Sequence, residues 1–138
     1  MTATRGTSNG DQGGRLVRRI LVTGSRDWLF PGFINVQLDY AWADLGGDPE
    51  TVLVSGACPT GADAMCEAWA EAHGIAVERH PAEWDKHPGR SAGFVRNAEM
   101  VRLGADLCLA FIKDESKGAT MTANLAERAG IETRRFEG

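Results

Sequence analysis

The chain has 138 residues, of which 43% are hydrophobic and 25% charged, and its net charge is −4. This length suits one domain with a real core, and the acidic balance argues against a protein that coats nucleic acid. No apolar run approaches the roughly 20 residues of a membrane span, and no signal peptide is evident, so we expect a cytoplasmic protein with no membrane partner.

Residues 1–16 are polar and rich in glycine, which predicts a flexible tail ahead of one domain at 17–138. In the domain, segments typical of strands alternate with segments typical of helices. We expect strands at 19–23, 51–55, 75–79, 105–112 and 131–136. We expect a first helix with Ile34, Leu38, Ala41 and Leu45 on one stripe, and further helices at about 61–73, 91–103 and 119–129.

This alternation predicts an α/β fold, a Rossmann-like domain with three αβα layers. Its parallel sheet of about five strands would have the order 3-2-1-4-5. Ligands of such sheets bind at the carboxyl ends of the strands, beside the switch in strand order. The turns after the first, second and fourth strands would therefore surround one crevice.

Three segments would meet at that crevice, and each contains glycine. They supply the candidate ligand-binding residues Gly24, Ser25 and Arg26, then Ser55, Gly56, Ala57, Gly61 and Asp63, then Gly118 and Thr120. A glycine turn that leads into a helix N-terminus offers free N–H groups and the positive end of the helix dipole, which suits an anion such as phosphate. A plain β–α turn is the alternative for Gly56 and Gly61.

Better-known nucleotide loops do not fit. Gly56 and Gly61 have the spacing of a P-loop, but Ala62-Asp63 stands where Lys-Ser/Thr is required, which argues against an ATPase. Only Gly24 follows the first strand, so the dinucleotide fingerprint of an ordinary dehydrogenase is missing.

Asp63 has two interpretations. Helical periodicity puts it on the outer stripe of its helix with Glu67 and Glu71, opposite Cys66, Trp69, Ala70 and His73. There it would serve as a cap, three residues after Thr60. Alternatively, it would accept hydrogen bonds from ribose hydroxyls.

Charged side chains and possible metal-binding side chains further restrict the class of ligand. Arg26, Arg90 and Arg96 would gather at the crevice and capture a small anion, whereas Lys113 and Lys117 are expected to be solvated. The segment 80–87 contains His, Glu and Asp but has no zinc-site spacing, so we expect neither a metal nor a cofactor. Cys66 and Cys108 are expected to be small buried hydrophobes.

Several motifs together resemble the YspA-like (YpsA-related) branch of the SLOG superfamily, over about residues 18–136. They are Gly24-Ser25-Arg26, Ser55-Gly56-Ala57, Gly61-Ala62-Asp63, Ala82-Glu83-Trp84, Ala92-Gly93, Arg96-Asn97-Ala98-Glu99-Met100, and Asp106 before Ala110-Phe111. The resemblance implies a Rossmann-like fold that senses or processes a nucleotide or a nucleotide-derived small molecule, with Arg96 and Asn97 facing the ligand. It also implies a homodimer.

The Lonely Guy phosphoribohydrolases, which cleave the N-glycosidic bond of nucleoside monophosphates, are related and give one alternative. Arg96-Asn97-x-x-Met100 is similar to their first motif, so Arg96 and Glu99 would be catalytic if the protein is an enzyme. Ala123 stands where their catalytic Glu is expected, which weakens this alternative because alanine cannot activate water.

A second alternative is a DprA-like accessory protein that binds single-stranded DNA. The segment from Ser55 to Asp63 is similar to a DprA motif. DNA binding requires a basic track or stacking aromatics, and Trp28 and Trp84 are the only plausible exposed aromatics. Packing of a loop against the domain is the alternative role for both. We therefore expect a small-molecule partner rather than nucleic acid.

Overall fold

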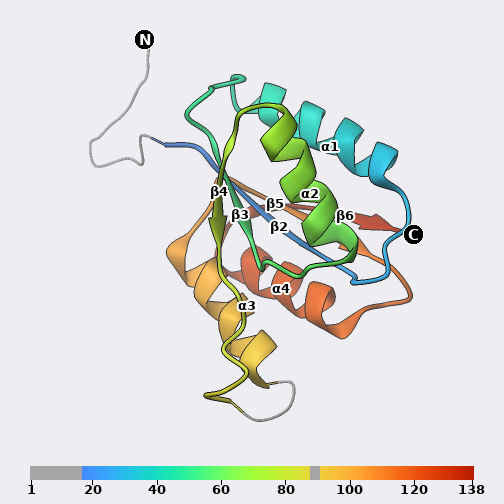
Figure 1. Ribbon diagram of the computed structural model, residues 1–138. Helices are drawn as coiled ribbons and strands as arrows, with labels where there is room; N and C mark the ends of the chain where they lie inside the picture. Colours follow the sequence, from blue (N-terminus) through green and yellow to red (C-terminus); the bar gives the residue numbers. More distant parts are fainter. Residues whose placement is uncertain (1–16, 88–90) are drawn as a thin grey trace.

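The computed structural model describes residues 17–87 and 91–138 (Figure 1). Along the chain the elements are β2 (Arg19–Gly24), α1 (Pro31–Asp44), β3 (Val52–Ser55), α2 (Gly61–Ala72), β4 (Ala76–Arg79), α3 (Ser91–Leu103), β5 (Leu107–Ile112), α4 (Lys117–Arg128) and β6 (Glu132–Glu137). The predicted strands and helices are present with small shifts at their ends. The predicted tail and Arg90 lie outside the described residues.

Five strands of the described chain form one parallel sheet in the order β4-β3-β2-β5-β6. This order is the predicted 3-2-1-4-5. β2 lies at the centre, where Leu21 pairs in register with Val54 on one side and with Cys108 on the other. All six residues of β5 are buried, which explains why its sequence, LCLAFI, is a continuous apolar run.

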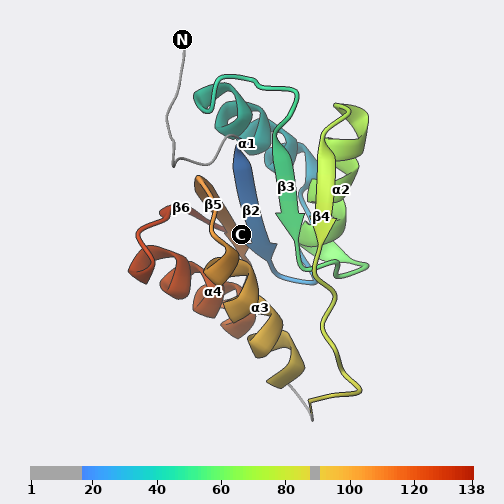
Figure 2. The same cartoon turned by 90° about the vertical axis from the view of Figure 1, so that its left-hand side faces the viewer.

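The helices form two layers. α1 and α2 cover one face of the sheet, and α3 and α4 cover the other (Figure 2). The larger core lies under α1 and α2 and contains Ile20, Val22, Ile34, Leu38, Leu53, Cys66, Trp69, Leu109 and Phe111. The smaller core lies under α3 and α4 and contains Leu21, Val54, Met100, Cys108 and Ile131. Both layers bring helix N-termini to the carboxyl edge of the sheet.

Loop packing decides the burial of two side chains for which the sequence suggested exposure. Trp28 is only 3% exposed, since its ring packs edge-on against Phe111 with the centroids 5.6 Å apart, which confirms the alternative that it packs a loop against the domain. The expectation for Asp63 is wrong. Asp63 is 7% exposed rather than on an outer stripe, because the loop before α2 folds back over the first turn of that helix. His73 differs in the other direction: it is exposed and stacks on Trp69.

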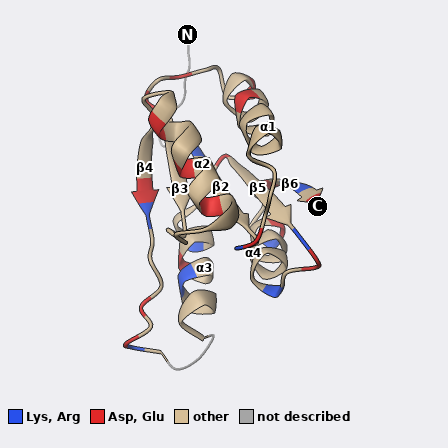
Figure 3. Ribbon diagram, turned by 45° about the vertical axis from the view of Figure 1, so that its right-hand side comes forward, with Lys and Arg blue, Asp and Glu red and all other residues tan. Residues whose placement is uncertain are grey.

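Charged residues of both signs are mixed over the described surface. Figure 3 shows basic residues on α3 and at the start of α4, together with acidic residues on α2 and in the loops. None of the helices in the described residues is long and apolar enough to cross a membrane.

Candidate functional site

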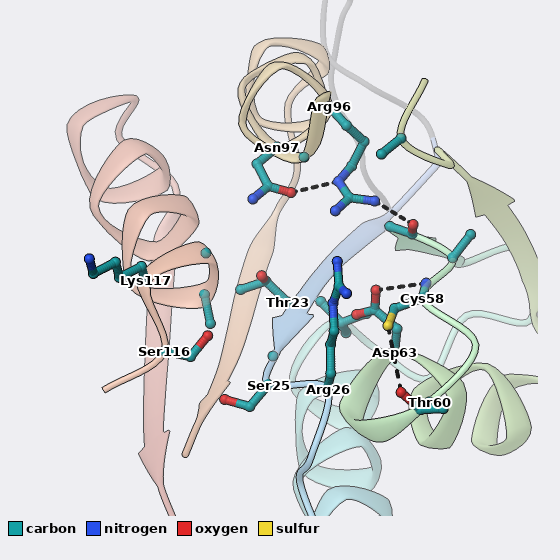
Figure 4. Close-up of a pocket in the computed structure, with 18 of the residues that line it drawn as sticks. Thr23, Ser25, Arg26, Cys58, Thr60, Asp63, Arg96, Asn97, Ser116 and Lys117 are labelled. Atoms are coloured by element: carbon teal, nitrogen blue, oxygen red, sulfur yellow. Dashed lines mark hydrogen bonds between the residues drawn. The ribbon is translucent and has the colours of Figure 1, made fainter. Parts of the chain in front are cut away.

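A pocket of about 1200 Å³ lies at the carboxyl edge of the sheet (Figure 4). Its walls are the end of β2, the loops that follow β2, β3, β4 and β5, and the N-terminal turns of α2, α3 and α4. Nine of the candidate ligand-binding residues line it: Gly24, Ser25, Arg26, Gly56, Ala57, Asp63, Arg96, Asn97 and Gly118. Ser55, Gly61, Thr120 and Glu99 are not among the lining residues.

Ser25 joins two of the converging turns. Its hydroxyl accepts a hydrogen bond from the Lys113 N–H at 2.8 Å and donates one to the Lys113 carbonyl at 3.3 Å. Its own carbonyl accepts the N–H of Ala62 at 3.1 Å, at the start of α2. Ser25 is 2% exposed, so its main role in this structure is to hold the ends of β2 and β5 and the start of α2 together.

Gly61 is required by the packing of these turns. It has a φ of +72°, and a Cβ at this position would lie 2.3 Å from the carbonyl oxygens of both Ser25 and Arg26. No side chain fits there without moving backbone. Gly61 therefore acts by permitting close approach of the turn after β2 to α2, rather than by lining the pocket.

Arg96 ties α3 to the loops after β3 and β4. One guanidinium nitrogen, Nη1, donates to the Gly56 carbonyl at 2.5 Å and to the His80 carbonyl at 3.3 Å. A Cβ on Gly56 would lie 2.8 Å from this nitrogen, so glycine is needed for the contact. Burial lowers the pKa of Arg96, while the charge of Asp63 opposes that change. The second terminal nitrogen, Nη2, has no hydrogen-bond partner within the described residues.

Asn97 is oriented by Arg96. The Arg96 Nε–H donates to the Asn97 Oδ1 at 2.6 Å, which turns the Asn97 amide nitrogen away from Arg96 (Figure 4). That nitrogen lies 3.9 Å from where a Cβ on Gly118 would be, at the start of α4. Asn97 is 6% exposed and lines the pocket, so its amide group is held in a fixed position in the pocket wall.

Asp63 is a buried carboxyl group in the pocket wall. One of its oxygens accepts the Cys58 N–H at 3.2 Å, in place of the predicted cap interaction with Thr60. Burial raises the pKa of Asp63 to about 6, although the Cys58 hydrogen bond and the charges of Arg96 and Arg26 lower it. Figure 4 shows the Arg26 side chain extending into the pocket beside this carboxyl. Asp63 can thus gain or lose a proton near neutral pH.

Left-handed backbone is concentrated at this site. Among the described residues other than glycine, Ala57, Asp114 and Glu115 have positive φ values of 62°, 53° and 54°. All three line the pocket. Such conformations cost about 1–3 kcal/mol each and cluster where the chain must present groups to a ligand. The loops after β3 and β5 therefore contain backbone conformations that are unfavourable in themselves and are held by the surrounding structure.

The candidate residues outside the pocket wall have other contacts. Ser55 donates to the Glu67 carboxylate at 2.7 Å and accepts the N–H of Ala57 at 3.0 Å, which supports the left-handed turn. Thr120 lies in the first turn of α4 and is half-buried. Glu99 is exposed and makes a salt bridge to Arg102 at 2.6 Å, which lowers the Glu99 pKa.

Ala123, where a Lonely Guy enzyme would carry its Glu, is fully buried against Ala110 and Ile112 of β5. It does not line the pocket. A carboxyl at this position would enter the core, so the structure offers no place there for a catalytic acid.

The lining residues that were not identified as site residues from the sequence include Cys58, Trp84, Phe94 and Lys117. Lys117 was expected to be solvated, and it is both exposed and part of the pocket rim. Cys58 and Phe94 are close in sequence to Gly56 and Arg96, which is the one signal that could have found them. Lys113 instead pairs with Asp27 and Asp114.

No cluster of three or more metal-ligating side chains occurs in residues 17–87 and 91–138. The groups that line the pocket are guanidinium, ammonium and amide donors, the buried carboxyl of Asp63, backbone N–H groups and aromatic rings, with the exposed carboxylates of Asp27, Asp114 and Glu115 at its rim. This set can bind an anion and a polar or flat organic group attached to it.

Comparison with known proteins is consistent with the motifs. Residues 18–87 match the model of the YAcAr family, the YspA, cpYpsA-related SLOG family. The chain belongs to this family. The match covers the turns after β2, β3 and β4, and thus more than half of the pocket wall of this YAcAr protein.

The Gene 61 protein of Mycobacterium phage D29 is similar to this YAcAr protein along most of its length. The two are 38% identical over 120 residues, which cover 83% of this chain and 93% of the phage protein. No solved structure matches the chain.

Proposed function

We propose that this protein binds a nucleotide or a nucleotide-derived small molecule in the pocket at the carboxyl edge of the sheet. The convergence of three β–α turns on one pocket carries the proposal. Membership of a SLOG family supports a nucleotide-related ligand in general. The volume of about 1200 Å³ is sufficient for a whole nucleotide.

The donors in the pocket favour an anionic group. The Arg96 Nη2 has no hydrogen-bond partner among the described residues, and Asn97 directs its amide nitrogen toward Gly118. The start of α4 adds backbone N–H groups with the positive end of its dipole. A phosphate between these groups would accept charge-assisted hydrogen bonds, which are stronger than bonds between neutral groups.

A thermal-shift assay tests this proposal. Ligand-free protein is screened against nucleoside phosphates and their derivatives, and a ligand at 100 times its dissociation constant should stabilise the fold by roughly 2.7 kcal/mol. Absence of any shift across a broad panel would contradict the proposal.

Two variants of α3 localise the site. Arg96→Ala should abolish most of the ligand-induced shift, because it removes a half-buried cationic donor of the pocket. Arg102→Ala is the matched control, since Arg102 is exposed on the same helix and pairs only with Glu99 in the described structure. Equal losses from the two substitutions would show that α3 does not supply the ligand contact.

Chemistry on the bound ligand is the second candidate function, and Asp63 is the observation that favours it. A carboxyl group with a pKa of about 6 in a pocket wall suits general acid or base catalysis. Glu99 is less suited, because it is exposed and paired with Arg102. Chromatography of nucleoside monophosphates incubated with the protein would detect release of free base. Release by wild type that is lost in Asp63→Asn supports this function, and no release by wild type contradicts it.

A further inference from the structure

Trp84 is an exposed aromatic residue at the pocket. It is 52% exposed, whereas Trp28 and Trp69 are each 3% exposed and Trp42 is partly buried in the core. Trp84 lines the pocket together with Phe94, which is 36% exposed. Burial of a large aromatic ring normally stabilises a protein, and most of the Trp84 ring remains in contact with solvent. A ligand that covered this ring would gain that stabilisation on binding.

Arg26 already occupies the face of this ring. Its guanidinium carbon lies 5.9 Å from the centre of the Trp84 ring, a cation–π distance. A flat molecule stacked between the two planes needs roughly 3.5 Å on each side, or about 7 Å in all. Arg26 is exposed, so a shift of its side chain by about 1 Å would open that gap.

The aromatic ring is continuous with the anion-binding groups. An atom of the Trp84 six-membered ring and the Arg96 Nη2 each lie 3.8 Å from where a Cβ on Gly93 would be, so ring and guanidinium are neighbours. On the other side of Arg96, Asn97 reaches Gly118. The pocket therefore has an aromatic end at Trp84 and a donor-rich end at the start of α4.

We infer that Trp84 and Arg26 form a stacking site for the base of the ligand, whose phosphate lies toward α4. This inference rests on the proposed function and names the ligand class as a nucleotide that keeps its base. Stacking is tolerant of base identity, because every base presents a flat face to the indole. Discrimination between bases then falls to the polar groups around the ring.

Isothermal titration calorimetry with AMP, GMP, CMP, UMP and ribose 5-phosphate tests the inference. Wild type should bind at least one nucleotide more tightly than ribose 5-phosphate. Trp84→Ala should weaken that nucleotide roughly 5- to 150-fold, the range for loss of one base–aromatic stack. Trp84→Phe should retain most of the affinity, and neither variant should change the affinity for ribose 5-phosphate.

Tyr40→Ala is the matched control. Tyr40 is 61% exposed on α1 and does not line the pocket, so its loss should leave all affinities unchanged. Circular dichroism checks that each variant is folded. Nucleotide binding should also quench tryptophan fluorescence in wild type but not in Trp84→Phe.

The outcomes separate the two proposals. Equal affinity of wild type for the nucleotides and for ribose 5-phosphate, or unchanged nucleotide affinity in Trp84→Ala, would overturn the stacking site and leave the proposed function standing. If Trp84→Ala weakened the binding of ribose 5-phosphate as much as that of the nucleotide, the stacking site would also be overturned. The ring would then support the structure of the whole pocket rather than contact a base. Failure of all five compounds to bind wild type would overturn the stacking site, whereas the proposed function would be overturned only by absence of any shift in the broad thermal-shift panel.

Discussion

Replacing Asp63 with Asn should stabilise the protein at neutral pH. The rise in the Asp63 pKa from 3.8 to about 6 is caused mainly by burial, which disfavours the ionised carboxylate. In the pH range between these values the folded protein binds a proton that the unfolded chain releases, so stability falls as pH rises. Above pH ~7 the ionised group costs about 3 kcal/mol, at about 1.36 kcal/mol for each pH unit. Asn is neutral and can still accept the Cys58 N–H.

Urea denaturation followed by circular dichroism measures this effect. The free energy of unfolding of Asp63→Asn minus that of wild type should increase between about pH 4 and pH 6 and level off near 3 kcal/mol above about pH 7. Glu71→Gln, an exposed change on the same helix, is the control and should stay within about 0.5 kcal/mol of wild type. A difference that does not vary with pH would refute the reasoning. A variant that becomes less stable than wild type as pH rises would show that Arg26 and Arg96 outweigh burial.

Two further predictions concern packing. Gly61→Ala should destabilise the fold by more than about 3 kcal/mol, because its Cβ would overlap the carbonyls of Ser25 and Arg26. The control Gly74→Ala, which has a similar φ but open space around it, should cost about 1 kcal/mol. Chemical denaturation compares the two variants, and equal losses of stability would contradict the close approach of these turns. Ala123→Glu should lower the free energy of unfolding by about 3 kcal/mol or more, because a carboxylate would be buried in the core, and it should gain no N-glycosidase activity. A variant that is as stable as wild type and releases free base from nucleoside monophosphates would contradict this prediction.

The fold could be predicted because the signals that specify it are local. Continuous apolar runs as short as 107–112 are typical of strands buried on both faces, because helices are usually longer. The helices between these strands are short and amphipathic. The strand order 3-2-1-4-5 was predicted because it is common in parallel sheets built from alternating strands and helices, and the structure has this order. The convergence of three turns then follows from topology alone.

The site was predicted less completely, for physical reasons. Periodicity indicates which helix residues face the sheet, but not which are covered by a loop, so the burial of Asp63 was missed. For Trp28 the sequence left exposure and loop packing open, and the structure shows it packed on Phe111. Gly61 and Ser55 were predicted to bind the ligand, but in the structure they support the pocket wall instead of lining it. Such contacts depend on segments that are far apart in the sequence.

Nitrogen-15 NMR of the ligand-free protein titrated with nucleoside monophosphates tests the central claim most directly, because it reports binding and its location together. The account predicts that the largest amide shifts occur in the pocket turns, at 24–26, 56–58 and 116–119, and that Arg96→Ala strongly reduces them. Shifts confined to other surfaces, or no shifts at millimolar ligand, would contradict a nucleotide site at the carboxyl edge of the sheet.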